Sequence, residues 1–258
     1  MNFLEVKGVS KSFSQNPYDR HIVLEGVNLE IPEGEFAVIT GFSGSGKSAL
    51  LSLLSGRNQP DSGTISLRGS TLESAMTPKP WSFGENTIDQ DLTTGTAVRL
   101  KKKNPAAPSV DQILESCGLA EKQETPVSLL SSGDLIRLNL ALALMSDAEL
   151  VLIDEAFIGL DRQEKYPVMM LVTDLMKSFR KTVVMMTNDL EDAILCGDRV
   201  FPLQRGAGAT LGPGFVIPIP RPRDIATTVI SPVFQRLRMD IMSHLTGQSQ
   251  SSLASHRT

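Results

Sequence analysis

Residues 41–48, Gly-Phe-Ser-Gly-Ser-Gly-Lys-Ser, have the complete pattern of a phosphate-binding loop. The apolar run at residues 36–40 precedes the loop and predicts a buried parallel strand, and Ala49-Leu50-Leu51 opens a helix directly after it. In such a loop the backbone N–H groups turn toward phosphate oxygens, and the N-terminus of the helix favours negative charge. We therefore expect this chain to bind a nucleoside triphosphate.

The roles of single loop residues follow from this pattern. Lys47 is expected to reach the β- and γ-phosphates, and Ser48 is expected to hold Mg²⁺. A chance match in a turn rich in glycine and serine is the alternative, but the strand before the loop and the helix after it argue against that explanation. The residues predicted to bind ATP in this segment are Gly41, Ser43, Gly44, Ser45, Gly46, Lys47, Ser48 and Ala49.

A second strand pattern begins at Glu149, continues through the apolar residues 150–153 and leads into two acids, Asp154 and Glu155. An aspartate at the carboxyl end of a parallel strand is expected beside the loop, where Asp154 would hold Mg²⁺ through water. Glu155 would polarise the water that attacks the γ-phosphate. A strand cap in an exposed turn explains one acid better than two.

Length and composition limit the alternatives. A chain of 258 residues can bury a full α/β core, and a net charge of −4 with no basic block argues against a nucleic-acid partner. The first residues lack the pattern of a secretory signal, and no uncharged apolar window of about 18 residues is present. Cys117 and Cys196 lack metal-ligand spacing, so we expect two buried thiols in the cytosol.

The remaining patterns predict strands that alternate with helices. Antiparallel strands are expected at residues 4–9, 22–24 and 27–31, and further strands at 64–67 and 182–187. Helices are expected at 135–145 and 166–180, and a third begins at Ser109 as N-cap and ends before Gly118. The alternation predicts an α/β fold with a parallel sheet. The apolar stripe of the last helix packs on its own domain or contacts a partner; it contains Phe234, Leu237, Ile241 and Leu245.

The segment Leu130-Ser131-Ser132-Gly133-Asp134 leads directly into the apolar helix, and Gly159-Leu160-Asp161 follows the acidic strand. In this order of motifs the chain resembles, over nearly its whole length, the nucleotide-binding subunit of an ABC transporter. Residues 34–36, 55–60 and 219–224 extend the likeness to cyanobacterial nitrate and bicarbonate importers, within the group that imports nitrate, sulfonates and taurine.

The resemblance implies a P-loop NTPase (RecA-like) core with an antiparallel β-subdomain, at residues 1–76 and 146–210, and an α-helical subdomain at about 77–145. An extension at 211–247 would complete an ABC ATPase domain over 1–247, followed by a disordered tail at 248–258. Phe13 would stack on adenine. In a head-to-tail pair, Ser131, Ser132 and Gly133 would meet the γ-phosphate of the partner's ATP, and Asp161 would lie in the loop that links the two sites.

The implied partners are transmembrane permease subunits, a second ATPase subunit and, indirectly, a solute-binding protein. The implied location is peripheral, at the cytoplasmic face of the inner membrane. The cofactors are ATP and Mg²⁺.

The sequence departs from the family pattern at several positions. Asn188 stands where the family has a histidine that contacts the γ-phosphate, and an amide cannot carry the proton or charge of imidazole. The glutamine that senses the γ-phosphate and Mg²⁺ aligns either with Pro78, which has no donor, or with Gln90. Ser132, Leu142 and Ala156 are lesser departures.

These departures suggest that the chain is the degenerate half of an ATPase heterodimer. ATP would stay bound at its own loop, with Glu155 and Asn188 as the catalytic residues of a weakened site. Turnover would occur mainly at the partner's loop, completed by residues 131–133 of this chain. A nucleotide-binding scaffold with little hydrolysis and a soluble P-loop NTPase are the alternatives.

Overall fold

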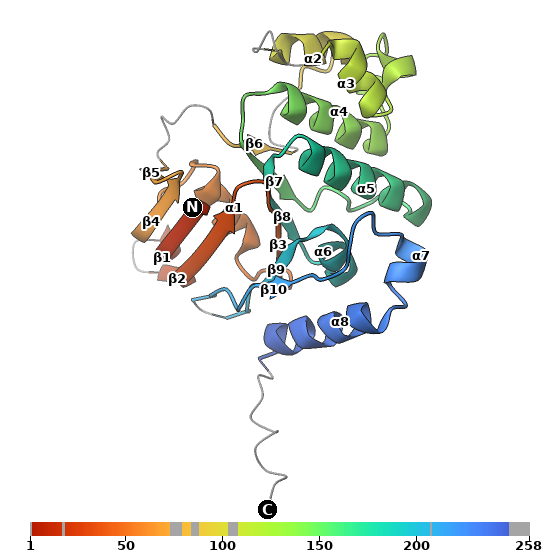
Figure 1. The fold of residues 1–258 in the computed structure, drawn as a ribbon. Coiled ribbons are helices and arrows are strands. Elements are labelled where there is room, and N and C mark those ends of the chain that lie inside the picture. Colours follow the sequence, from red (N-terminus) through yellow and green to blue (C-terminus); the bar gives the residue numbers. More distant parts are fainter. Residues whose placement is uncertain are drawn as a thin grey trace, which may run out of the picture.

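The computed structural model shows an α/β fold with two sheets (Figure 1). It describes residues 2–16, 19–72, 79–83, 88–102, 108–206 and 208–247. Pro78 and the tail at 248–258, both subjects of predictions, lie outside the described residues. None of the helices within these ranges combines the length and apolar composition that crossing a bilayer requires.

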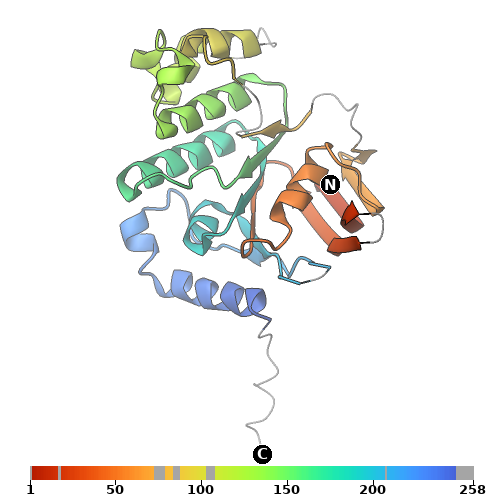
Figure 2. The same cartoon turned by 180° about the vertical axis from the view of Figure 1, so that it is seen from behind.

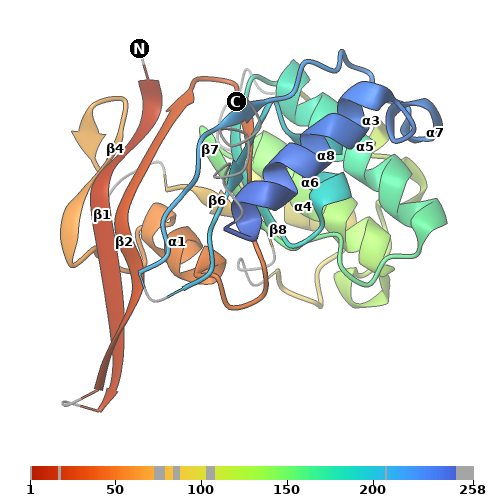
Figure 3. The same cartoon turned by 90° about the horizontal axis from the view of Figure 1, so that it is seen from below.

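The first sheet is antiparallel and is dominated by one long hairpin, which Figure 3 shows projecting beyond the rest of the fold. The prediction of separate strands at 22–24 and 27–31 is wrong, because one strand runs through both. The pairing of the hairpin shifts register at several points, and Gly26, with φ of 59°, lies within the continuous strand. The sheet has the order β2-β1-β4-β5 and contains β1 (Asn2–Asn16), β2 (Asp19–Pro32), β4 (Ser62–Leu67) and β5 (Ser70–Thr71).

The second sheet has the order β10-β9-β3-β8-β7-β6 and is parallel except for β10. It confirms the strands expected at 36–40, 149–154 and 182–187, whereas β9 was not predicted. Its strands are β3 (Phe36–Thr40), β6 (Trp81–Ser82), β7 (Leu150–Asp154), β8 (Thr182–Thr187), β9 (Arg199–Pro202) and β10 (Phe215–Val216).

Side chains alternate between the two faces of this sheet. Ile39 and Leu152 pack with α1 (Lys47–Leu54) and the antiparallel sheet, and Figure 2 shows α1 between the two sheets. Val38 and Ile153 pack on the other face with the remaining helices. A parallel sheet covered on both faces accounts for the continuous apolar runs in the sequence. The other helices are α2 (Thr94–Lys101), α3 (Val110–Ser116), α4 (Ser132–Met145), α5 (Arg162–Ser178), α6 (Leu190–Cys196), α7 (Ile225–Thr228) and α8 (Pro232–Leu245); two short 3₁₀ turns are η1 (Ala120–Lys122) and η2 (Val127–Leu129).

Capping side chains set the helix starts, and two starts differ from the prediction. The helix expected from residue 135 begins at Ser132, because Ser131 accepts a hydrogen bond from the backbone N–H of Asp134 (3.1 Å). The helix expected from residue 166 begins at Arg162, because Asp161 caps it. The predicted cap at Ser109 is confirmed.

Burial of the two cysteines is also confirmed, and it raises the pKa of both thiols to about 12.

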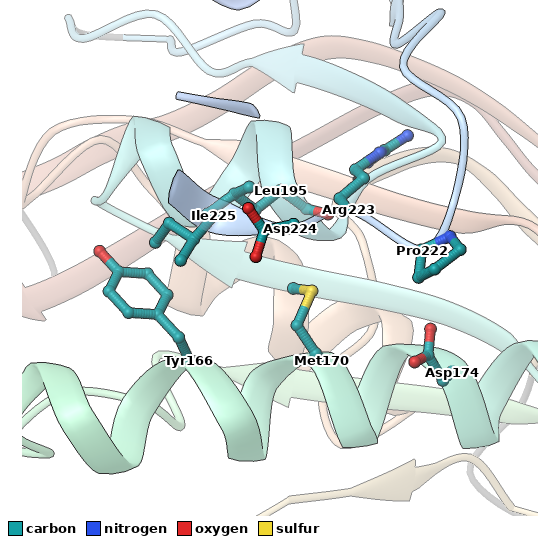
Figure 4. Close-up of a pocket in the computed structure, with 8 residues that line it drawn as sticks. All are labelled: Tyr166, Met170, Asp174, Leu195, Pro222, Arg223, Asp224 and Ile225. Atoms are coloured by element: carbon teal, nitrogen blue, oxygen red, sulfur yellow. Dashed lines mark hydrogen bonds between the residues drawn. The ribbon is translucent and has the colours of Figure 1, made fainter. Parts of the chain in front are cut away.

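The carboxyl-terminal extension is packed on the parallel-sheet core. In α8, Phe234, Ile241 and Leu245 are buried and Leu237 is partly buried, so the stripe packs on its own domain. Figure 4 shows a pocket of about 250 Å³ where the extension meets α5 and α6. Along α5, Tyr166, Met170 and Asp174 face this pocket, one helical turn apart.

Arg223 fastens the extension to the end of α6. Its side chain is 4 % exposed, and its guanidinium donates hydrogen bonds to the carbonyls of Ile194 (2.8 Å), Leu195 (3.0 Å) and Gly197 (2.7 Å). Burial, with the neighbouring charge of Arg221, lowers the pKa of Arg223 to about 10. One buried cation therefore satisfies backbone acceptors that the end of a helix leaves open.

We expect Arg223→Met to lower the free energy of unfolding by about 3 kcal/mol or more, because each buried carbonyl left without a donor costs about 1–3 kcal/mol. Urea denaturation measures the change. The control is Arg236→Met, which alters a guanidinium with an 83 % exposed side chain and should shift stability by less than about 0.5 kcal/mol. Equal stability of the two variants would contradict the role of Arg223.

Candidate nucleotide-binding site

Three neighbouring strands bring the predicted site residues to one edge of the parallel sheet. The phosphate-binding loop follows β3, Asn188 follows β8, and Asp154 ends β7, with β8 between the other two. Thr40 pairs with Thr187 and Asp154 pairs with Met186, so the three carboxyl ends are level. Ligands bind at this edge in open α/β sheets.

The loop ends in a helix whose first N–H groups have no side-chain cap. Gly44 (φ 76°) and Gly46 (φ 98°) have left-handed backbones, which a residue with a side chain rarely adopts. Gly46 is the N-cap of α1 but offers no side-chain acceptor, and the first turn contains no acid. Among the described α-helices, α1 alone lacks a capping side chain. Its amino end therefore fits an anionic group such as phosphate.

Lys47 lies at the centre of the site and is 5 % exposed. Its ammonium donates hydrogen bonds to the carbonyls of Gly41 (2.9 Å) and Phe42 (3.2 Å) and to Oδ1 of Asn188. Oε1 of Glu155 lies 3.7 Å from Nζ. Burial lowers the pKa of Lys47, and the carboxylates of Glu155 and Asp154 oppose this shift. Lys47 thus links the loop to the ends of β8 and β7.

Glu155 has an unusual backbone for a residue with a side chain. Its φ is 46°, in the left-handed region, and its N–H donates to the carbonyl of Met186 (3.0 Å). Such conformations cost free energy and often occur at functional sites. Here the conformation accompanies a carboxylate that faces the ammonium of Lys47.

The loop lines a pocket of about 450 Å³ whose lining contains many of the predicted residues, including Phe13. Phe13 is 42 % exposed and lies at the pocket although it belongs to β1. Val23 of β2 also lines the pocket, and nothing in its local sequence distinguishes it from other strand residues. The lining consists of Phe13, Val23, Ser43, Gly44, Gly46, Lys47, Ser48, Ala49, Asp154 and Glu155.

The pocket suits a nucleotide with Mg²⁺. The uncapped helix start and Lys47 provide donors for phosphate oxygens. The hydroxyl of Ser48 and the carboxylate of Asp154 are oxygen ligands of the kind that Mg²⁺ prefers. Gln90 is not among the lining residues; its side-chain amide donates to the carbonyl of Ile88 (3.1 Å).

Residues 131–133, Ser-Ser-Gly, form the Ser-Gly motif; neither this motif nor Asp161 lines the pocket. The hydroxyl of Ser131 donates to Oδ2 of Asp134 (2.7 Å), which also pairs with Lys122. Burial would raise the pKa of Asp134, but the hydrogen bonds from Lys122 and Ser131 outweigh burial and lower it. Ser132 is exposed and Gly133 is buried, so the motif presents its first two residues to solvent.

The segment after Asn188 contains two acids that the sequence analysis missed. Asp189 caps α6 by accepting from the N–H groups of Glu191 (2.9 Å) and Asp192 (3.3 Å). Nζ of Lys165, on α5, lies 2.7 Å from Asp192 and 3.1 Å from Asp189. Burial raises the pKa of Asp192 to about 6 despite the ion pair with Lys165. An acid two residues after a strand and directly before a helical stretch was the available signal for this cap.

Comparison with known proteins gives four concordant findings. A family model described as "ABC transporter" matches residues 24–158. The bicarbonate transport ATP-binding protein CmpD of Synechococcus elongatus is 32 % identical over 92 % of this chain and 87 % of its own length. The nitrate import ATP-binding protein NrtD of the same organism is 32 % identical over 94 % and 91 %. The dimeric structure of MJ0796, a bacterial ABC transporter cassette, has a TM-score of 0.68 at 25 % identity and covers 83 % of this chain and 98 % of that one. The predicted resemblance and fold class are confirmed.

Asp192 gives a pH-dependent contribution to stability. Its pKa is about 6 in the folded chain and 3.8 ordinarily, so between these values the folded state binds a proton that the unfolded state releases. Stability contributed by this carboxyl therefore rises as the pH falls from about 7 to about 5, by about 1 kcal/mol. Chemical denaturation of the wild type and Asp192→Asn at both pH values measures it. A stability difference that stays constant with pH would contradict this assignment.

Proposed function

Because this chain belongs to the ABC transporter family, we propose that it is the ATP-binding subunit of an importer for a small anion of the nitrate or bicarbonate type. One observation carries the nucleotide-binding part: Lys47, Asn188 and Glu155 come from three strand ends and meet at one phosphate-binding loop. The names of the relatives CmpD and NrtD support the class of transported anion.

In this proposal the pocket residues divide into three roles. Phe13 stacks on the adenine, and the loop with Lys47 binds the phosphates. Ser48 and Asp154 hold Mg²⁺, which neutralises charge on the phosphate oxygens. Glu155 orients the attacking water.

The position of the Ser-Gly motif supports a second ATPase subunit. Ser131 and Ser132 are exposed and are not part of this chain's own pocket, so they are available to complete the pocket of a partner. Near the motif and Asp161, Leu129 is 74 % exposed and Ile158 is 68 % exposed, which suits a contact surface. Permease subunits would anchor the pair peripherally at the cytoplasmic face of the inner membrane.

Asn188 supports an asymmetric pair. Its amide accepts from Lys47 and can orient this lysine, but it cannot supply the positive charge of an imidazolium beside a phosphate. The partner subunit would then have the consensus residues and the faster site. The same contact favours a second candidate, a scaffold subunit that binds ATP with little hydrolysis, and the turnover experiment below distinguishes the two.

We expect the full chain to bind Mg-ATP, and Lys47→Ala to weaken binding at least tenfold, because charged hydrogen bonds contribute about 1.5–3 kcal/mol each. Isothermal titration calorimetry measures both affinities. Lys7→Ala is the control, since Lys7 is exposed and pairs only locally with Glu5. Absence of Mg-ATP binding, by the chain and by its complex, would refute nucleotide binding.

The asymmetry predicts unequal effects of two glutamate substitutions in the assembled importer. Replacing the catalytic glutamate of the partner ATPase by glutamine should remove nearly all ATP turnover and transport, whereas Glu155→Gln should leave most of both. Steady-state turnover of the purified complex and substrate uptake into proteoliposomes measure this. Equal losses would refute the degenerate half-site. Turnover that survives both substitutions would refute the assignment of Glu155. Full ATP binding without any turnover in the wild-type complex would favour the scaffold.

A further inference from the structure

We propose that Lys165 is a positioning residue, which holds Asn188 against Lys47 through the amino-terminal end of α6. The inference rests on the proposed nucleotide-binding function and adds a residue that does not line the pocket. Lys165 lies in the first turn of α5, immediately after the loop that contains Asp161. It reaches the segment directly after Asn188.

The contact is a partly buried charge cluster. The side chain of Lys165 is 15 % exposed and that of Asp192 is 5 % exposed, and their charged atoms are 2.7 Å apart. Asp189 is the second carboxylate, with Oδ2 at 3.1 Å from Nζ. Burial would lower the pKa of Lys165, but both carboxylates outweigh burial and raise it, so the lysine stays charged. Removing this cation leaves the nearly inaccessible carboxylate of Asp192 without its ion-pair partner, which is costly.

The charge cluster holds the backbone of the segment that follows Asn188. The N–H of Asp189 donates to the hydroxyl of Thr187 (3.0 Å) at the end of β8, and its carboxylate caps α6. Asn188 therefore lies between a strand end and a helix cap, and Lys165 anchors the cap. The side chain of Asn188 is exposed, and its amide oxygen accepts a hydrogen bond from the ammonium of Lys47. A shift of the cap would move this oxygen and weaken its hydrogen bond with Lys47, because hydrogen bonds depend steeply on distance and angle.

The same turn of α5 also contacts the Ser-Gly motif. A Cβ added to Gly133 would lie 1.9 Å from Oε1 of Glu164, so this carboxylate occupies the space beside the glycine. Figure 1 shows α5 between α4, which carries Gly133, and α6. Glu164 and Lys165 are neighbours in this turn. Glu164 thus contacts the Ser-Gly motif, and Lys165 contacts the segment that positions Asn188.

The test uses the preference of the full chain for Mg-ATP over Mg-ADP, because only ATP has the γ-phosphate. Asn188→Ala should lower this preference about tenfold with unchanged ADP affinity, as expected for one lost charged hydrogen bond. Lys165→Met should lower the preference at least about threefold, also with unchanged ADP affinity, and Lys165→Arg should restore it. Calorimetry or competition with a fluorescent nucleotide measures the ratio.

Arg162→Met is the matched control. Arg162 lies in the same turn and reaches α6 through Glu191 at 3.4 Å, but it does not contact Asp189 or Asp192. Its substitution should leave the nucleotide preference unchanged. An equal effect of Arg162→Met would overturn the proposal, because the change would then reflect loss of any cation in this turn.

A double-mutant cycle tests whether Lys165 acts through Asn188. The variant with both Lys165→Met and Asn188→Ala should lose no more preference than Asn188→Ala alone. Additive losses, equal losses of ATP and ADP affinity, or an unchanged preference in either single variant would overturn the positioning role. Failure of the wild type to bind Mg-ATP would instead refute the proposed function, so the two failures are distinguishable.

Discussion

The buried charge of Lys47 is the interaction on which the arrangement of this site depends. An ammonium with 5 % exposure needs acceptors on every side, and it finds them in loop carbonyls, in Asn188 and beside Glu155. These groups follow three different strands, so the lysine is satisfied only when β3, β8 and β7 have paired in register. The correct sheet order and the phosphate site are therefore one structural requirement.

The parts of the fold set by local patterns were predictable. Continuous apolar runs gave the parallel strands because both faces of the sheet are covered. The phosphate-binding loop was recognisable because its glycines need left-handed backbones at defined spacing. The starts of α4 and α5 were placed too late, since the polar capping residues interrupt the apolar periodicity on which the expectation relied. The hairpin strand β2 was divided in two because an internal glycine resembles a turn.

Contacts between distant segments were not predictable from spacing. Lys165 meets Asp189 across 24 positions, and Arg223 meets Ile194 across 29. Each is an ordinary basic residue in its local sequence, and its partner becomes evident only once α6 is packed beside α5 and the extension. Gln90 is the opposite case. Its distance along the chain from Lys47 is plausible for the glutamine of the family, but its amide donates to the carbonyl of Ile88 and does not line the pocket. Spacing along the chain alone therefore does not place a side chain in the pocket.

The hydrogen bonds from Arg223 to the end of α6 have a consequence for biosynthesis. Strand β8 and α6 leave the ribosome well before the extension, yet the carbonyls at the end of that helix receive their side-chain donors from Arg221 and Arg223. Until then, water must satisfy these groups, and the nascent helix is open at its carboxyl end. The extension therefore completes the domain last during translation. A chain released before residue 223 would leave the carboxyl end of α6 exposed to chaperones and proteases.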